Sequence, residues 1–322
     1  MAQVGDPTSV IAGEELERET RAGVSAAWER VNEVLLSRLA GTYSVVWEYT
    51  PGSPQGRETT RKDFGTHEFL ALGKQMKIIN RVSGGERVGA LNGDYWFNIA
   101  RKDDKSRFTI ERLVPQNDPS AQQRELLEDY RAERLNEILS AWYLLGDPFA
   151  EVLQRPQFVV RDAHNLETTG HRKVRVDFTY AMPGHSPPLL AAGDGSYVVL
   201  DPVMQWCLVE FELQVSWGVE RGEYEYEDAI DGFPKLRRMR LIQSNQVEAT
   251  PAVIVATKVV SFSRLERPVN TTDIGGFRLP DYGFPEPNFE ARRSQVYLWY
   301  FLIAIGCLVC GVLLYRRRSG HR

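Results

Sequence analysis

The chain has 322 residues, of which 43% are hydrophobic and 25% are charged, fractions typical of a folded globular protein. Its 39 basic residues are outnumbered by 43 acidic ones, and the net charge of −4 argues against a nucleic-acid partner. Cys207 is the only cysteine before the apolar C-terminal segment, which excludes a disulfide framework and a cysteine-based metal site from that part of the chain.

The N-terminal region is expected to contain one long amphipathic helix. Residues 1–13 are predicted to be disordered, and they have neither the basic nor the apolar region of a signal peptide. From residue 14 to about residue 40, apolar residues recur at intervals of three or four, which places them on one helical face. This stripe consists of Val24, Trp28, Val31, Leu35 and Leu39. We expect it to cover strand residues such as Trp47 and Phe178, like a lid over an apolar groove.

Most of the remaining chain alternates between apolar and polar residues, as half-buried strands do. Tyr43, Val45 and Trp47, for example, fall on one face of an extended segment. About eleven such runs, joined mostly by short turns, predict a large antiparallel sheet. The runs are 42–50, 68–72, 76–80, 86–91, 94–100, 107–114, 173–180, 206–217, 222–229, 235–243 and 253–265.

Glycine-containing segments mark the predicted connections between strands. Asn92-Gly93 predicts a two-residue hairpin turn in which both residues have positive φ. The segment Gly193-Asp194-Gly195 is interpreted as a loop.

A second helix is predicted from about residue 120 to residue 145, midway through the strands. Its apolar face comprises Leu127, Tyr130, Leu135, Ile138, Trp142 and Leu145. Strands on both sides of a helical insertion predict an α+β fold, with one sheet of nine or more strands packed against helices on one face.

The C-terminal region is expected to connect the folded domain to a membrane. Prolines and glycines in residues 266–295 predict an extended tether. Residues 296–315 carry no charge, and at about 1.5 Å per residue a helix of this length would reach roughly 30 Å, enough to cross a bilayer. Aromatic residues lie near both ends of this predicted transmembrane helix, and the basic tail of residues 316–322 follows it.

The charges that flank this segment predict its orientation. Arg316, Arg317, Arg318 and Arg322 follow it, whereas only the pair at 292–293 precedes it closely. Because the more basic flank tends to stay in the cytoplasm, the large domain is expected on the extracytoplasmic, periplasmic side. This orientation requires a signal sequence upstream of Met1, or one that has been removed; without it, the sequence would predict a cytosolic tail-anchored protein.

Motifs for known chemistry are missing from the sequence. We find no nucleophile elbow, phosphate-binding loop or dinucleotide fingerprint, and no cofactor or metal site is predicted. The histidines lack metal-ligand spacing and are interpreted as surface or turn residues; they are His67, His164, His171 and His185. Three glutamates on one strand are predicted to pair with arginines of the next strand; they are Glu223, Glu225 and Glu227, opposite Arg237, Arg238 and Arg240.

Two segments suggest a known architecture. GSYVVLDPVMQWCLVEFEL has a turn at Leu200-Asp201-Pro202 before Trp206, and YEYEDAIDGFPKLRRMRL has another at Asp231-Gly232-Phe233-Pro234. Together with the two helices and the large sheet, residues 14–265 resemble the periplasmic lipoprotein-carrier (LolA-like) fold. This resemblance implies a curved half-barrel sheet that holds acyl chains under helices.

A further resemblance concerns the segment before the membrane. FRLPDYGFPEP is similar to the stretch that precedes C-terminal anchors in uncharacterised exported bacterial proteins. An anchor distinguishes this chain from the soluble carriers, because a tethered protein cannot ferry cargo across a compartment.

The aromatic residues predict a binding function. A curved sheet with many large rings could leave an apolar groove for a lipid or an acylated protein. The candidate groove residues are Trp28, Tyr43, Trp47, Trp96, Phe178 and Trp206. Plain core packing is the alternative interpretation of each. Two other functions stay open, a structural or regulatory protein-binding ectodomain and an enzyme of unidentified class.

Overall fold

The computed structural model describes residues 7–50, 61–82, 85–116, 135–166, 172–181, 190–230, 232–245, 253–267 and 275–289. The chain divides into two compact units, residues 1–277 and residues 278–322. All elements discussed below belong to the first unit unless stated otherwise.

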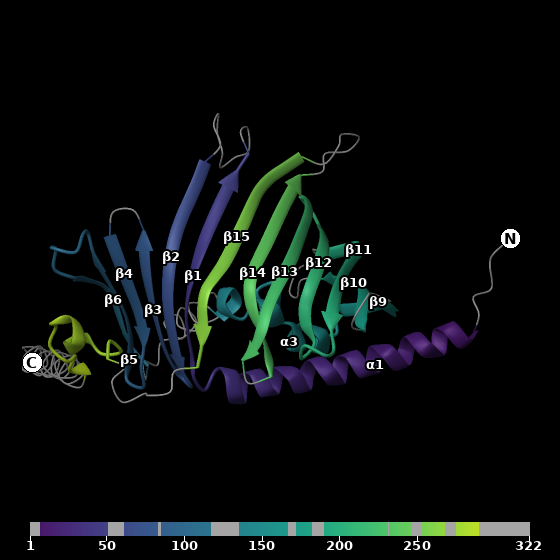
Figure 1. The fold of residues 1–322 in the computed structure, drawn as a ribbon, viewed down its shortest axis with the longest axis horizontal. Coiled ribbons are helices and arrows are strands. Elements are labelled where there is room, and N and C mark those ends of the chain that lie inside the picture. Colours follow the sequence, from purple (N-terminus) through teal and green to yellow (C-terminus); the bar gives the residue numbers. More distant parts are fainter. Residues whose placement is uncertain are drawn as a thin grey trace, which may run out of the picture. The chain divides into compact units, whose positions relative to one another are not determined.

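One antiparallel sheet dominates the first unit (Figure 1). Within the described residues it contains thirteen strands, which confirms the prediction of a single large antiparallel sheet. The strands are β1 (Leu39–Tyr49), β2 (Arg61–Leu72), β3 (Gln75–Val82), β4 (Gly85–Leu91), β5 (Tyr95–Arg101), β6 (Thr109–Pro115), β9 (Phe158–Leu166), β10 (Lys173–Ala181), β11 (Leu190–Asp201), β12 (Cys207–Val215), β13 (Gly218–Ile230), β14 (Phe233–Asn245) and β15 (Val253–Glu266).

The strand count exceeds the predicted number because β9 and β11 were not expected. In β9, buried and exposed residues do not alternate strictly, and Asp162, for example, is exposed. Asp162 lies opposite Asp177 of β10, where the pairing of the two strands shifts register. In β11, Gly193 to Gly195 lie within the strand, where pairing with β10 shifts register between Phe178 and Tyr180. The interpretation of this glycine segment as a separate loop is therefore wrong, because it forms an irregular part of a strand.

The order of the strands follows the chain except at the centre. It runs β6-β5-β4-β3-β2-β1-β15-β14-β13-β12-β11-β10-β9, so β1 pairs with the last strand as well as with β2. Tyr43, for example, lies opposite His67 of β2 and Phe262 of β15. The face that carries Tyr43 is called the inner face here, and the opposite one the outer face.

The N-terminal helix α1 spans Pro7–Arg30 and continues as a π-helical turn over Val31–Leu35. It thus begins inside residues 1–13, so the prediction that this whole segment is disordered is wrong for its second half. The helix also ends before residue 40, because Leu39 already pairs with Ala71 as the first residue of β1. The helix packs against β9 and α3 (Phe149–Gln154), along one end of the second half of the sheet (Figure 1).

The inserted segment is less regular than predicted. Leu135–Ile138 are helical, but Ser140–Trp142 form a 3₁₀ turn and the strand β7 (Tyr143–Leu144) pairs with β8 (Asp147–Pro148). The helix therefore does not reach residue 145, where Leu145 and Gly146 turn the chain with φ of 57° and 87°. Residues 120–134 of the predicted helix lie outside the described residues.

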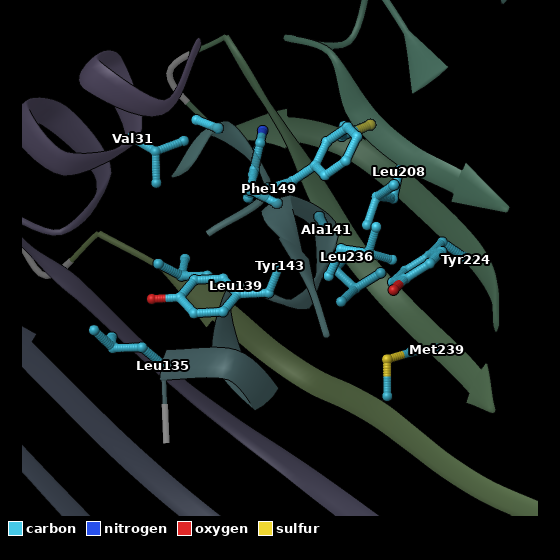
Figure 2. Packing of buried hydrophobic residues seen from close by; sticks show 14 of the residues in the cluster. Val31, Leu135, Leu139, Ala141, Tyr143, Phe149, Leu208, Tyr224, Leu236 and Met239 are labelled. Carbon is cyan, nitrogen blue, oxygen red and sulfur yellow. The ribbon is translucent and has the colours of Figure 1, made fainter. Parts of the chain in front are cut away.

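The core fills the space between the inner face, α1 and the inserted segment. Figure 2 shows Leu139 and Tyr143 of the inserted segment between Val31 on one side and Leu236 and Tyr224 of the sheet on the other. All five side chains are at most 8% exposed. Burial of these apolar groups, at about 25 cal/mol per Å², is the main source of stability for such a sheet.

The hairpin between β4 and β5 forms at the predicted place but with a different turn. The Asn92 side-chain oxygen accepts hydrogen bonds from the backbone N–H groups of Asp94 and Tyr95, at 2.8 and 2.9 Å. Gly93 does not have positive φ, so the predicted backbone conformation of this turn is wrong. The asparagine side chain supplies the turn instead.

The other predicted turns are present. Asp201 accepts hydrogen bonds from the N–H groups of Val203 and Met204 between β11 and β12. Gly232, with φ of 81°, lies between the end of β13 and the start of β14.

In the second unit, Leu279–Tyr282 of the predicted tether form a 3₁₀ turn that ends at Gly283, with φ of 82°. The predicted transmembrane segment, residues 296–315, lies outside the described residues. Within the described residues, no helix has the length and apolar character needed to cross a bilayer.

The packing of α1 against the β11–β12 turn leads to a stability prediction. A Cβ atom on Gly23 would clash with the indole ring of Trp206, whereas one on Gly13 would lie 3.9 Å from the nearest atom, the Ala163 carbonyl oxygen. We expect Gly23→Ala to lower the free energy of unfolding by about 1–3 kcal/mol through overpacking. Gly13→Ala, the matched control in the same helix, should raise it by roughly 0.5–1 kcal/mol. Urea denaturation of the full-length variants measures both, and equal stabilisation by the two would contradict this packing.

Candidate functional site

The six predicted groove residues do not line one groove. Tyr43 and Trp47 lie on the inner face of β1, four residues apart in the strand. Phe178 of β10 is 1% exposed and stacks on Phe158 with ring centroids 4.5 Å apart, deep in the core. Trp28 of α1 is partly buried and meets the ring of Tyr143 edge-on at 5.5 Å.

The remaining two tryptophans lie elsewhere in the first unit. Trp206 follows the turn after β11 and packs beneath α1 at Gly23. Trp96 of β5 is 1% exposed in a separate small cluster with Leu91 and Val114. Of the six, Tyr43 and Trp47 thus share one face of β1, Phe178 and Trp96 are enclosed in packed interior, and Trp28 and Trp206 are partly buried against the core.

The helical stripe is buried as expected. Val24, Val31, Leu35 and Leu39 belong to the main core cluster, which also contains Phe178. Trp47 packs at the border of this cluster and is only partly buried.

An aromatic hollow of about 420 Å³ lies next to Trp47. Its lining residues are Trp47, Tyr49, Trp217, Gln243, Asn245, Val255 and Ala256. Trp47 and Tyr49 stack in parallel at 5.7 Å, and Trp217 in the β12–β13 turn is 44% exposed. We call this site the aromatic hollow.

Strand register explains why a hollow forms there. Tyr49 of β1 lies opposite Ala256 of β15, which in turn lies opposite Gln243 of β14. The small alanine side chain between two larger residues leaves space on the inner face of the sheet. Sequence alternation places Tyr49 on the same face as Trp47, but Ala256 and Gln243 join them only through the pairing of β1 with β15.

A polar cluster borders the aromatic hollow on the core side. Lys258 lies opposite Trp47 in the sheet, and its ammonium nitrogen is 5.4 Å from the Trp47 ring centroid. The same nitrogen is 2.8 Å from Oε1 of Glu137 in the inserted segment, and Tyr43 donates a hydrogen bond of 2.9 Å to Oε2 of Glu137. His67 stacks on the Tyr43 ring at 4.7 Å.

This cluster corrects one interpretation of the histidines. His67 is 7% exposed on the inner face, so it is neither a surface nor a turn residue. Its position follows from the pairing of β1 with β2, which the sequence pattern alone does not fix. His164 is exposed on β9, and His171 and His185 lie outside the described residues.

A carboxyl group also faces the inner side of the sheet beside the aromatic hollow. Glu220 of β13 pairs in register with Gln243, whose amide nitrogen donates a hydrogen bond of 3.1 Å to Oε2 of Glu220. Burial raises the pKa of the Glu220 carboxyl, and the Gln243 hydrogen bond and the Lys258 charge oppose this shift. Sequence reasoning missed Glu220 because it lies outside the predicted run 222–229.

The outer face carries the predicted ion pairs. Glu223, Glu225 and Glu227 lie 3.7, 3.5 and 3.6 Å from the guanidinium groups of Arg240, Arg238 and Arg237, respectively. These pairs confirm the structural interpretation of the three glutamates.

A second group of polar residues lies farther along the outer face. Asp162, His164 and Asp177 offer ligand atoms within 4.8 Å of one another. They come from the paired strands β9 and β10, so residue spacing within one strand cannot predict this group. Arg175 already donates hydrogen bonds to both oxygens of Asp177, so that carboxylate is partly neutralised.

The free thiol of Cys207 is unsuited to nucleophilic chemistry. It is fully buried at the start of β12, and burial raises its pKa to about 12, so the thiol stays protonated at neutral pH. The pKa of the neighbouring Tyr226 hydroxyl is also raised by burial.

Comparison with known proteins gives a structural likeness only. The sequence matches no model of a protein family, and no curated protein matches it. The structure is similar to a domain from Vibrio parahaemolyticus assigned to outer membrane lipoprotein sorting, with 10% sequence identity and a TM-score of 0.37, over 84% of this chain and 96% of that one.

A weaker likeness involves MucB in its complex with MucA(peri), with 11% identity and a TM-score of 0.09, over 74% of this chain and 93% of that one.

The Glu137–Lys258 pair should stabilise the inserted segment measurably. Both side chains are less than one-fifth exposed, at 17% and 14%, so removing one leaves the other poorly solvated. We expect Glu137→Gln and Lys258→Met each to lower the free energy of unfolding by roughly 1–3 kcal/mol, and the double variant to lose less than the sum. Urea denaturation of all four proteins gives the coupling energy.

The exposed pair of Glu225 and Arg238 on the outer face is the matched control for this cycle. Their side chains are 55% and 46% exposed, so the corresponding cycle should give a coupling of about 0.2–1 kcal/mol at most. Equal coupling energies in the two cycles would show that Glu137 does not fasten the insertion to the sheet.

Proposed function

We propose that this protein binds an apolar ligand, such as a lipid or the acyl chain of an acylated protein, in the aromatic hollow, without catalysing a reaction. The observation that carries this proposal is the hollow itself, in which Trp47, Tyr49 and Trp217 meet at the border of the main core cluster. Exposing large aromatic rings to water costs free energy. A ligand that covers these rings would therefore gain binding free energy from their burial.

The dimensions and chemistry of the aromatic hollow suit such a ligand. Its volume of about 420 Å³ lies within the range of roughly 300–1,000 Å³ that is common for small-molecule sites. Apolar side chains dominate its lining, and Gln243 and Asn245 provide a few polar atoms that could orient a head group. This combination of apolar walls and few polar groups is the usual pattern of ligand sites.

The proposal includes a location at a membrane. The uncharged stretch of residues 296–315 supports a single-pass anchor, and the arginines that follow it support an extracytoplasmic position of the large domain. A ligand site held close to a bilayer would receive apolar molecules without a soluble carrier. Protease added to intact spheroplasts should then degrade the domain and spare a tag placed after Arg322.

A second candidate function, protein binding, has one observation in its favour. The sheet is open, with β6 and β9 at its two edges. Ile110 of β6 and Val159 of β9 are each 43% exposed. Edge strands can accept an added strand from a partner through backbone hydrogen bonds, with exposed side chains giving specificity.

A fluorescent alkyl probe without a charged head group tests the ligand-binding proposal. Trp217 is 44% exposed, so Trp217→Ser should remove one wall of the hollow without unfolding the sheet. We expect the affinity for the probe to fall about tenfold or more, as for an aromatic residue that anchors a ligand. Fluorescence titration of the full-length protein measures this change.

Phe64→Ser is the matched control for this test. Phe64 is 61% exposed, and it lies opposite Val46 on the outer face, away from Tyr43 and Trp47. This variant loses a similar exposed ring and should bind the probe as the original protein does. Absence of probe binding to the original protein, or an equal loss in both variants, would remove the support for an apolar ligand and favour protein binding.

A further inference from the structure

Glu220 is a carboxyl group beside the aromatic hollow with one neutral hydrogen-bond donor among the described residues. The carboxyl lies on the inner face of β13, between Leu213 of β12 and Gln243 of β14 in the register of the sheet. In the described part of the chain, its hydrogen-bond partner is the Gln243 amide, and it forms no ion pair. A partly buried carboxylate held by one neutral donor is costly, because the hydrogen bond replaces only part of its hydration.

The nearest cation does not supply the missing charge. Lys258 influences Glu220 electrostatically, but its ammonium group is already 2.8 Å from Glu137 and is 14% exposed. The Glu137 carboxylate therefore neutralises this lysine within the polar cluster. The neighbourhood of Glu220 contains two carboxylates and one ammonium group. Its charge is therefore negative in sum, and it would attract one more positive charge.

Gln243 connects this carboxyl to the ligand site. Its side chain lines the aromatic hollow, while its amide nitrogen binds Glu220. The amide oxygen of Gln243 and the second oxygen of Glu220 are both acceptors. A group with several N–H donors and a positive charge fits such a pair of acceptors, and a primary ammonium group has three donors.

The surrounding rings favour the same ligand chemistry. Trp47, Tyr49 and Trp217 provide aromatic surface next to these acceptors, and aromatic faces attract cations as well as alkyl chains. A carboxylate ligand, in contrast, would bring a second negative charge towards Glu220.

We propose that the aromatic hollow selects apolar molecules that carry a primary ammonium group, with the alkyl part against Trp47 and Trp217 and the ammonium group on Glu220 and Gln243. This inference rests on the proposed function, because it names the head group of the ligand that the hollow binds.

Three ligands with the same ten-carbon chain test the head-group preference: decylammonium, decanol and decanoate. Isothermal titration of the full-length protein, at ligand concentrations below micelle formation, gives the three affinities. We expect decylammonium to bind about tenfold more tightly than decanol, and decanoate to bind most weakly. In Glu220→Gln the affinity for decylammonium should approach that for decanol, while decanol binding stays unchanged.

Glu225→Gln is the matched control, because Glu225 lies on the outer face of the same strand and its removal changes the net charge equally. It should keep the full preference for decylammonium. Near-ultraviolet circular dichroism of both variants verifies that the aromatic packing is retained.

The possible results separate the two proposals. Equal binding of all three ligands, a preference for decanoate, or a preference that survives Glu220→Gln would overturn the ammonium inference and leave apolar binding standing. Failure of all three ligands to bind would overturn both.

Discussion

The pairing of β1 with β15 is the constraint on which the rest of this structure depends. It joins two halves of the chain that are more than two hundred residues apart, with Tyr43 opposite Phe262. The same register places Trp47 opposite Lys258 and Tyr49 opposite Ala256. A shift of β1 by one residue would turn Tyr43, Trp47 and Tyr49 to the outer face, away from their partners on β15, because successive strand residues point to opposite sides. The aromatic hollow and the polar cluster beside it are therefore consequences of one long-range pairing.

Local sequence patterns predict the strands well where one face is buried and the other is wet. In β10, Val174, Val176 and Phe178 are buried and alternate with polar residues, and this strand was predicted nearly to its ends. In β11 the pattern fails, because Gly193 and Gly195 are typical of a loop in sequence but belong to an irregular strand in the structure. The end of the inserted helix was also mispredicted, since the apolar residues at 142–145 suit a 3₁₀ turn and a short strand as well as a helix.

The candidate site was only partly predictable for a related reason. Trp47 could be predicted as a site residue because large aromatic residues are easily recognised in an alternating strand pattern, and Tyr49 lies on the same face of that strand. Trp217, Gln243 and Glu220 come from other strands or turns, and only the register of β13, β14 and β15 gathers them. Conversely, Trp96 and Phe178 look the same as Trp47 in the sequence, yet each is 1% exposed in packed surroundings. Residue type alone does not distinguish a ring that fills the core from one that lines a hollow.

The polar cluster links the inserted segment to the aromatic hollow. Glu137 holds the Lys258 ammonium group, and Lys258 lies over the Trp47 ring that forms one wall. Tyr43 binds the other oxygen of Glu137, so the carboxylate is held from two neighbouring strands. Such a partly buried ion pair contributes little net stability compared with apolar packing, but it specifies one position of the insertion, since any other leaves a charge without its partner. The inserted segment thus holds the Lys258 ammonium group near the Trp47 ring, where the core borders the hollow.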